Sequence, residues 1–244
     1  IVIAGVVLTV VVALVLLGGV KRIAKVSEMV VPFMAISYLL LSLFVLFFNV
    51  TSIPTAVAQI FVGAFSPRAV AGGIAGSFLV AMQNGIARGI FSNEAGLGSA
   101  PIAAAVAKTK EPVRQGLVSM TGTFIDTIVI CTLTGLTIVI TGSWNIGLDG
   151  VYVTMNAFSA LPGVFSEIGP VLLSVCLVFF AFTTILGWNF YGERCLEYIA
   201  GRNKIAIYAY RIAYIAAVFI GPYMTIQAVW NIADIFNGLM AIPN

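Results

Sequence analysis

The stretch Met82–Pro101, MQNGIARGIFSNEAGLGSAP, interrupts an otherwise apolar part of the chain. It holds four glycines, two charges and two amides: Gly85, Gly89, Gly96, Gly98, Arg88, Glu94, Gln83 and Asn93. Each glycine weakens a helix by about 1 kcal/mol relative to alanine. A helix broken within lipid exposes backbone groups that need other partners, and transporters use such breaks as substrate and ion sites. We expect the backbone to leave helical geometry within Gln83–Asn93; the alternative is a cytoplasmic glycine-rich loop.

Composition and charge place the chain in the membrane. Hydrophobic residues make up 61% of it and charged residues 9%, as in a polytopic membrane protein. Its basic residues cluster in 21–28, 108–114 and 194–204, which the positive-inside rule predicts to be cytoplasmic loops. Arg68 lies in a segment predicted to be external, so the chain must cross between Arg68 and Lys108. The residues between them would form a helix about 60 Å long, about twice the thickness of the hydrocarbon core. This length favours one crossing with an unwound middle over a loop.

The apolar segments predict an all-α fold in one transmembrane domain, residues 1–244. Seven crossings are expected, at 1–20, 30–48, 69–108, 114–141, 168–191, 204–221 and 223–241. Residues 54–66 are too short to span the bilayer and are expected to form a surface or re-entrant helix. Pro32 is expected in the first turn of its span, where its missing N–H is tolerated.

The sequence carries few signs of other functions. It has no histidine and three cysteines at no metal-binding spacing, and it has neither a Walker A sequence nor a strand-preceded GxGxxG. We therefore predict no enzyme, no organic cofactor and no nucleic-acid partner. An ion channel, which would need polar rings along a pore, stays an alternative, as does a membrane protein of unrelated function.

Two acidic residues near or within spans have both structural and functional interpretations. Asp126 lies at mid-span, where a carboxylate marks a pathway or has a partner, either Arg88 or the neighbouring Thr123 and Thr127. Glu94 is expected at the start of the helix after the break, where a carboxylate complements the helix dipole.

Thr183 and Thr184 are adjacent hydroxyls in an apolar span. They can supply oxygen ligands to a hard cation such as Na⁺, or they can bond back to carbonyls one turn earlier. Trp188 follows on the same face and can wall a small pocket or be an ordinary interfacial aromatic.

Several longer segments carry a resemblance to a known family. These are RGIFSNEAGLGSAPIAAA from 88, GTFIDTIVICT from 122, FAFTTILGWNFYGE from 180 and VWNIADIFNGLMAIPN from 229. In this order they resemble the alanine or glycine:cation symporter family. The resemblance implies the leucine-transporter-type fold of two inverted repeats, with residues 1–49 ending the first repeat and 69–241 forming the second. It also implies that the chain lacks the N-terminal helices.

The family's function implies a sodium-coupled symporter of a small neutral amino acid in the cell membrane. Backbone groups of Gly85, Ile86 and Ala87, with Ser92 and Asn93, would line the substrate pocket at a break spanning 84–93. Thr183, Thr184 and the Phe180 carbonyl would bind sodium, and Trp188 would face the substrate side chain. Na⁺ or H⁺ as the coupling ion, and alanine, glycine or a D-amino acid as the substrate, stay open.

Overall fold

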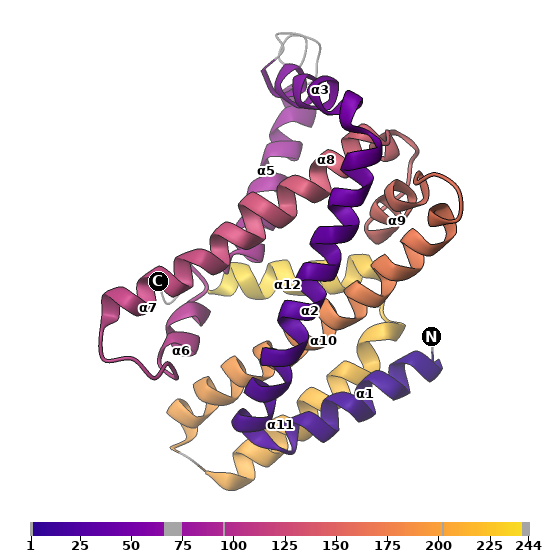
Figure 1. Ribbon diagram of the computed structural model, residues 1–244. Coiled ribbons are helices and arrows are strands. Elements are labelled where there is room, and N and C mark those ends of the chain that lie inside the picture. The colour runs from indigo at the N-terminus through magenta and orange to yellow at the C-terminus, as the bar shows by residue number, and fades with distance from the viewer. Residues whose placement is uncertain (1, 66–74, 95, 202, 241–244) are drawn as a thin grey trace. The chain divides into compact units, whose positions relative to one another are not determined.

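The computed structural model describes residues 2–65, 75–94, 96–201 and 203–240, and none of these residues lies in a β-strand (Figure 1). The first part of the chain forms α1 (Val2–Leu16), α2 (Gly19–Phe48), η1 (Val50–Ser52), α3 (Ile53–Phe65), α5 (Ala75–Ser92) and α6 (Ser99–Ala104). The second part forms α7 (Pro112–Thr123), η2 (Phe124–Cys131), α8 (Thr132–Ile140), η3 (Ser143–Asn145), α9 (Val151–Ser159), α10 (Phe165–Ala200), α11 (Lys204–Ile220), η4 (Gly221–Tyr223) and α12 (Ile226–Leu239). The all-helical prediction is confirmed for this part of the chain, as expected where lipid forces the backbone to bond within each segment.

Four helical segments of the described chain are long and apolar enough to cross a membrane: Lys21–Phe48, Pro112–Ile140, Phe165–Ala200 and Lys204–Tyr223. They correspond to four of the seven predicted crossings. Helices α1 and α12 have 15 and 14 residues, fewer than the about 20 that span the hydrocarbon core. The predicted crossing 69–108 lies partly outside the described residues. The structure therefore shows a polytopic helical protein, and the count of seven stays a prediction.

Two of the predicted basic loops are largely helical. Residues 21–28 lie inside α2, and α10 continues through Arg194 to Ala200. Lysine, arginine and glutamate are good helix formers, so a helix can continue through these residues. The charges mark where the lipid-embedded part ends and do not mark where the helix ends. Pro32 likewise lies inside α2 rather than in a first turn.

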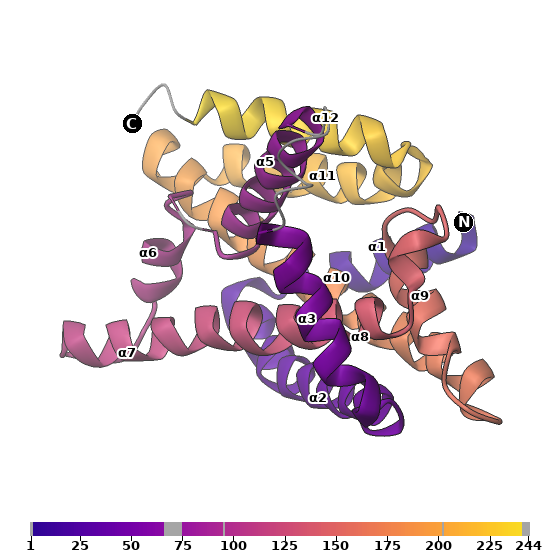
Figure 2. The same cartoon turned by 90° about the horizontal axis from the view of Figure 1, so that it is seen from above.

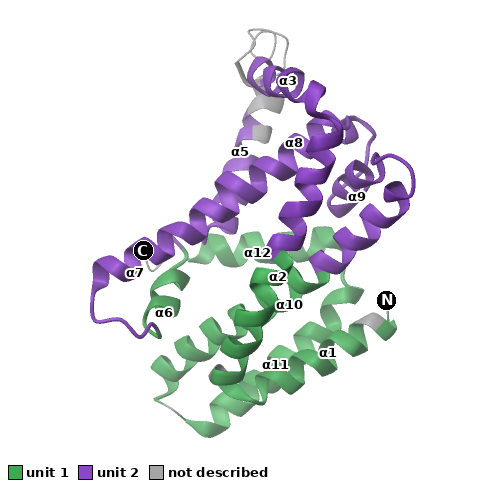
Figure 3. Cartoon of the chain, viewed as in Figure 1, with its two compact units in different colours: residues 1–34, 97–106, 178–244 green, residues 35–96, 107–177 purple. Residues whose placement is uncertain are grey.

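The chain divides into two compact units that share the long helices (Figure 3). Unit 1 contains residues 1–34, 97–106 and 178–244, and unit 2 contains residues 35–96 and 107–177. Helices α2 and α10 contribute to both units. The assignment of inverted repeats, which concerns a different division of the chain, stays a prediction.

In unit 1, α1 lies along α11, as both views show (Figures 1 and 2). Val12, Val15 and Leu16 of α1 form a buried cluster with Phe182 and Leu186 of α10. The Tyr214 hydroxyl of α11 donates to the Ile185 carbonyl of α10 at 2.7 Å. These contacts hold the part of α10 that carries Thr183 and Thr184.

In unit 2, α3 crosses α8, which also packs against α9 (Figure 2). The hydroxyl groups of Tyr38 and Thr134 are hydrogen bonded, which ties α2 to α8. Tyr38 also lies beside Phe158 of α9, with ring centroids 6.1 Å apart. These contacts position the helical rod 112–140 on which Asp126 lies.

Gly169 permits the close approach of α9 and α10 in unit 2. A Cβ atom at this position would lie 2.7 Å from the Phe158 carbonyl oxygen, which belongs to the backbone and cannot turn away. We expect Gly169→Ala to lower the unfolding free energy by about 1–3 kcal/mol, as overpacking does. The measurement is the midpoint of thermal unfolding of the purified protein. Gly187→Ala is the matched control in the same helix, because its Cβ would meet nothing within 4 Å. Equal midpoints for the two variants would contradict the prediction.

Candidate substrate and cation site

The helix break lies later in the chain than predicted. Helix α5 runs without interruption through Gly85 and Gly89 and ends at Ser92, so the expected break within 84–93 is wrong. The Asn93 N–H donates to the Gly89 carbonyl at 3.1 Å and so closes the last turn. Two glycines cost about 2 kcal/mol in a helix, less than the backbone bonds that lipid would leave unmade.

The break itself comprises Asn93–Gly98, within which Ala95 is not described. Glu94 has a φ of 53°, and Gly96 and Gly98 both have a φ of 77°. These left-handed residues end the helical course, and glycine adopts such angles without steric cost. Glu94 therefore lies in the turn and not in the first turn of α6, where it was expected.

The predicted substrate residues fall into two groups. Gly85, Ile86 and Ala87 lie within α5 with their side-chain positions exposed, so helical geometry engages the backbone groups that were expected to bind substrate. Ser92 and Asn93 lie at the end of α5 and are joined to a second element.

That element is the π-helical segment η2 in the middle of the rod 112–140. The Ser92 hydroxyl donates to Asp126 Oδ2 at 2.7 Å, and the Thr127 hydroxyl donates to Asn93 Oδ1 at 2.8 Å. Thr127 Oγ1 lies 3.5 Å from Asp126 Oδ2. We call Ser92, Asn93, Asp126 and Thr127 the oxygen cluster.

The π-helical geometry bears on how the oxygen cluster forms. Bonds from i to i+5 wind the backbone less per residue than α-helical bonds, so adjacent side chains point closer together. Asp126 and Thr127, neighbours in sequence, both reach the end of α5 in this way. Short π segments are rare and occur frequently at functional sites.

The structure shows which side chains lie beside the Asp126 carboxylate. Its carboxylate accepts a hydrogen bond from the Ser92 hydroxyl, and the Thr127 hydroxyl, one of the expected partners, lies 3.5 Å from it. Ser92 was missed as a partner, because 34 residues separate it from Asp126 and no sequence pattern links them.

Thr183 and Thr184 both bond back to the preceding turn, as the structural alternative predicted. The Thr184 hydroxyl donates to the Phe180 carbonyl at 2.8 Å. The Thr183 hydroxyl lies 3.1 Å from the same carbonyl oxygen, 3.0 Å from that of Phe179 and 3.6 Å from Met34 Sδ. The three oxygens predicted to bind sodium are therefore gathered around the Phe180 carbonyl.

Trp188 lies one turn after Thr184 in α10 and is half-buried. Its ring meets that of Tyr191 edge to face, with centroids 5.8 Å apart. Trp188 and the threonine pair belong to unit 1, whereas Ser92 and Asn93 belong to unit 2.

An ion-pair network in unit 1 was also missed. Arg211 of α11 makes a two-pronged contact with Glu193 of α10, with Nε–Oε2 and Nη2–Oε1 distances of 2.7 and 2.8 Å. Glu193 is 5% exposed. Arg194 adds a contact to Glu193 at 3.4 Å and one to Glu197 at 2.5 Å. The sequence signal was an arginine and a glutamate inside apolar helices, which calls for a partner.

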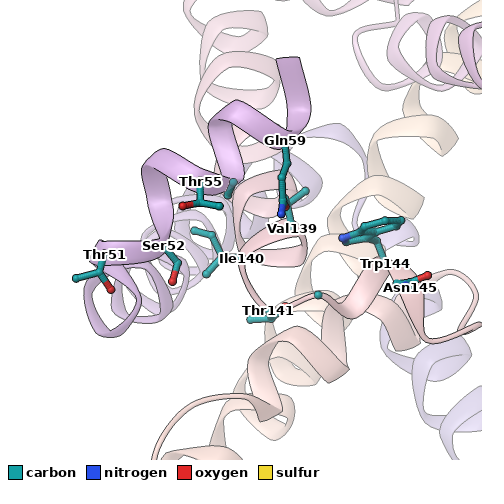
Figure 4. A pocket seen from close by; sticks show the side chains of 11 residues that line it. Thr51, Ser52, Thr55, Gln59, Val139, Ile140, Thr141, Trp144 and Asn145 are labelled. Carbon is teal, nitrogen blue, oxygen red and sulfur yellow. The ribbon is translucent and has the colours of Figure 1, made fainter. Parts of the chain in front are cut away.

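A hollow of about 460 Å³ lies in unit 2 between the start of α3 and the end of α8 (Figure 4). Its lining is made of hydroxyl, amide and apolar groups and of the Trp144 indole: Thr51, Ser52, Thr55, Ala56, Gln59, Val139, Ile140, Thr141, Gly142, Trp144 and Asn145. None of these residues is charged. A zwitterion would find no counter-charge in this hollow, so it is a poorer substrate site than the oxygen cluster.

Long apolar helices, a polar break after α5 and a carboxylate at mid-span define a polytopic membrane protein of the transporter class. The chain belongs to the sodium:alanine symporter family, which it matches over residues 1–244. This result confirms the resemblance seen in the sequence. Members of this family are transporters and not enzymes.

Individual relatives agree with this assignment. The chain is 52% identical to an uncharacterized transporter of Haemophilus influenzae, with 99% of this chain and 53% of the relative covered. It is 48% identical to the sodium/alanine symporter AgcS of Methanococcus maripaludis, covering 99% and 52% of the two chains. It is 39% identical to the probable sodium/glutamine symporter GlnT of Bacillus subtilis, covering 98% and 49%. The chain thus spans about half the length of the relatives it matches.

Proposed function

We propose that the chain is part of a secondary active transporter in the cell membrane that couples Na⁺ influx to the symport of a small neutral amino acid, alanine or glycine, by alternating access. Membership of the sodium:alanine symporter family over residues 1–244 carries this proposal. The basic segments 21–28, 108–114 and 194–204 would face the cytoplasm.

For the coupling ion, we assign Thr183, Thr184 and the Phe180 carbonyl as ligands. The support is that both threonine hydroxyl oxygens lie within 3.1 Å of the Phe180 carbonyl oxygen. Each hydroxyl oxygen keeps a lone pair for a cation while its proton bonds to the helix. Hard oxygen ligands suit Na⁺, and no organic cofactor enters the mechanism.

For the substrate, the polar end of α5 is the favoured region. Ser92 and Asn93 offer a hydroxyl and an amide beside the break, where charged groups of a zwitterion need hydrogen-bond partners. Gly85, Ile86 and Ala87 would contribute surface only, because their backbone groups are engaged in the helix. The resemblance to the family assigns Trp188 to face the substrate side chain, and a tryptophan there would favour alanine or glycine over glutamine.

The test is uptake by the full-length protein in proteoliposomes. An inward sodium gradient should drive saturable accumulation of labelled alanine, and unlabelled alanine or glycine inside the vesicles should support counterflow. Glutamine in excess should compete weakly. Unsaturable conductance without counterflow would indicate a channel and contradict the proposal, and equal competition by glutamine would contradict the assigned substrate size.

A further inference from the structure

The hollow between α3 and α8 in unit 2 adjoins a second hollow (Figure 4 shows the first). The second measures about 540 Å³ and shares Thr55, Gln59, Val139 and Trp144 with the first. Both volumes lie within the range of about 300–1,000 Å³ that is usual for small-molecule sites. We call the two adjoining hollows the α3 groove.

The first hollow carries polar side chains that the described part of the chain leaves without hydrogen bonds. Hydroxyl groups of η1 and α3 lie on one side of it, and the side chains of η3 lie on the other (Figure 4). The side chains without a hydrogen bond to a described residue are those of Thr51, Ser52, Thr55, Gln59, Trp144 and Asn145. These groups are therefore available to a ligand that both donates and accepts hydrogen bonds.

The second hollow is mostly apolar. Apart from the shared residues, it is lined by Ala58, Ile60, Val62 and Gly63 of α3. Ile60 and Val62 are exposed, which suits a surface helix whose apolar side meets acyl chains. Trp144 lines both hollows, and its indole joins an apolar body to an N–H donor, as is common at the membrane–water boundary. The groove thus changes from polar to apolar between its two hollows, as an amphiphile does.

We infer that the α3 groove binds a membrane lipid whose headgroup is a sugar, with the sugar in the first hollow and an acyl chain in the second. The lining residues of both hollows are uncharged, so a phosphate or an ammonium group would meet no counter-charge among them. A sugar brings several hydroxyls, each of which donates and accepts, and its C–H face can pack on an indole. A headgroup with one hydroxyl would leave most of the polar side chains unmatched.

The lipid would belong to the outer leaflet. The spans Lys21–Phe48 and Pro112–Ile140 lead from the basic segments 21–28 and 108–114, which are predicted to be cytoplasmic, to the two sides of the groove. The inference goes beyond the proposed function, because it does not depend on which ion or amino acid the protein carries.

Quenching of Trp144 fluorescence by lipids with brominated acyl chains tests the inference. The full-length protein is placed in phosphatidylcholine nanodiscs, and the difference between the wild type and Trp144→Phe gives the signal of Trp144, which is 62% exposed. Brominated glucosyl diacylglycerol should reach half-maximal quenching at about one fifth of the mole fraction that brominated phosphatidylglycerol needs, the effect of about 1 kcal/mol. Unbrominated glucosyl diacylglycerol should restore the fluorescence, and unbrominated phosphatidylglycerol should not.

Two amide substitutions locate the binding site. Gln59→Leu/Asn145→Leu removes both amides at similar volume and should reduce the preference for the sugar lipid to less than about twofold, because the lost hydrogen bonds are those that distinguish the headgroups. Gln115→Leu, which removes an amide of α7 outside the groove, is the matched control and should keep the preference of the wild type.

Several outcomes would overturn the inference. Equal quenching by the two lipids would indicate ordinary lipid contact, and a preference for phosphatidylglycerol would indicate an anion site. The absence of quenching by either lipid would mean that another part of the protein fills the groove. An unchanged preference in the double amide variant would place the sugar elsewhere. If this variant does not fold, as judged by size-exclusion chromatography, the competition between the unbrominated lipids decides.

Discussion

Replacing Thr183 and Thr184 together by valine in the full-length protein is expected to abolish the sodium dependence of uptake. Valine keeps the shape of each side chain and removes its oxygen. A cation that loses two of its oxygen ligands to apolar groups loses the interactions that compensate its dehydration. Each ligand is worth about 1.5–3 kcal/mol by analogy with charged hydrogen bonds, so the sodium concentration for half-activation should rise at least a hundredfold.

The measurement is the sodium activation curve of alanine uptake in proteoliposomes, together with the folded fraction of the variant. Ser174→Ala is the matched control on the same helix, because the Ser174 hydroxyl also bonds back one turn, to Pro170 O at 2.8 Å. If the control and the double variant behaved alike, the effect would come from the lost helix bond. An unchanged activation curve in the double variant would place the ion elsewhere.

Arg211→Met is expected to destabilise the protein by about 3 kcal/mol. The substitution leaves the Glu193 carboxylate, which is 5% exposed, without its two-pronged partner. Removing one member of a buried ion pair costs about 3–5 kcal/mol. We expect the lower end of this range, because Arg194 still lies 3.4 Å from Glu193.

A double-mutant cycle separates the pair from its surroundings. Glu193→Leu combined with Arg211→Met should recover most of the lost stability, because it removes both buried charges and not only one. Unfolding free energies of the four proteins are the measurement. Arg114→Met, at an exposed position of α7, is the control and should change stability by less than about 0.5 kcal/mol. Additive effects of the two single substitutions would show that the two side chains are not coupled.

The existence of a helix break was predicted from the sequence, but its position was not. Four glycines lie between Met82 and Pro101, and sequence reasoning chose the first two, Gly85 and Gly89. In the structure, the backbone leaves helical geometry instead at Glu94, Gly96 and Gly98, where φ is positive. Glycine lowers the cost of leaving a helix at every position, and only the path to the next element decides which glycine takes the left-handed angle.

The oxygen cluster shows the same limit for side chains. Asp126, Ser92 and Asn93 were each singled out from the sequence, yet their pairing was not, because their partners are 34 positions away. Glu193 and Arg211, 18 positions apart, form their ion pair across two helices in the same manner. Thr183 and Thr184 were easier, because the partners of their hydroxyls lie three and four residues earlier in the same helix.

The sequence by itself determined the membrane class, the all-helical fold, the family and the four long apolar spans. These features follow from local physics, because lipid obliges each segment to satisfy its own backbone hydrogen bonds and rewards about 20 consecutive apolar residues. Tertiary structure alone decided where α5 ends, that η2 is π-helical and which side chains meet Asp126 and Glu193. Those choices depend on how distant segments pack, since a buried charge is stabilised by whichever partner the fold brings to it.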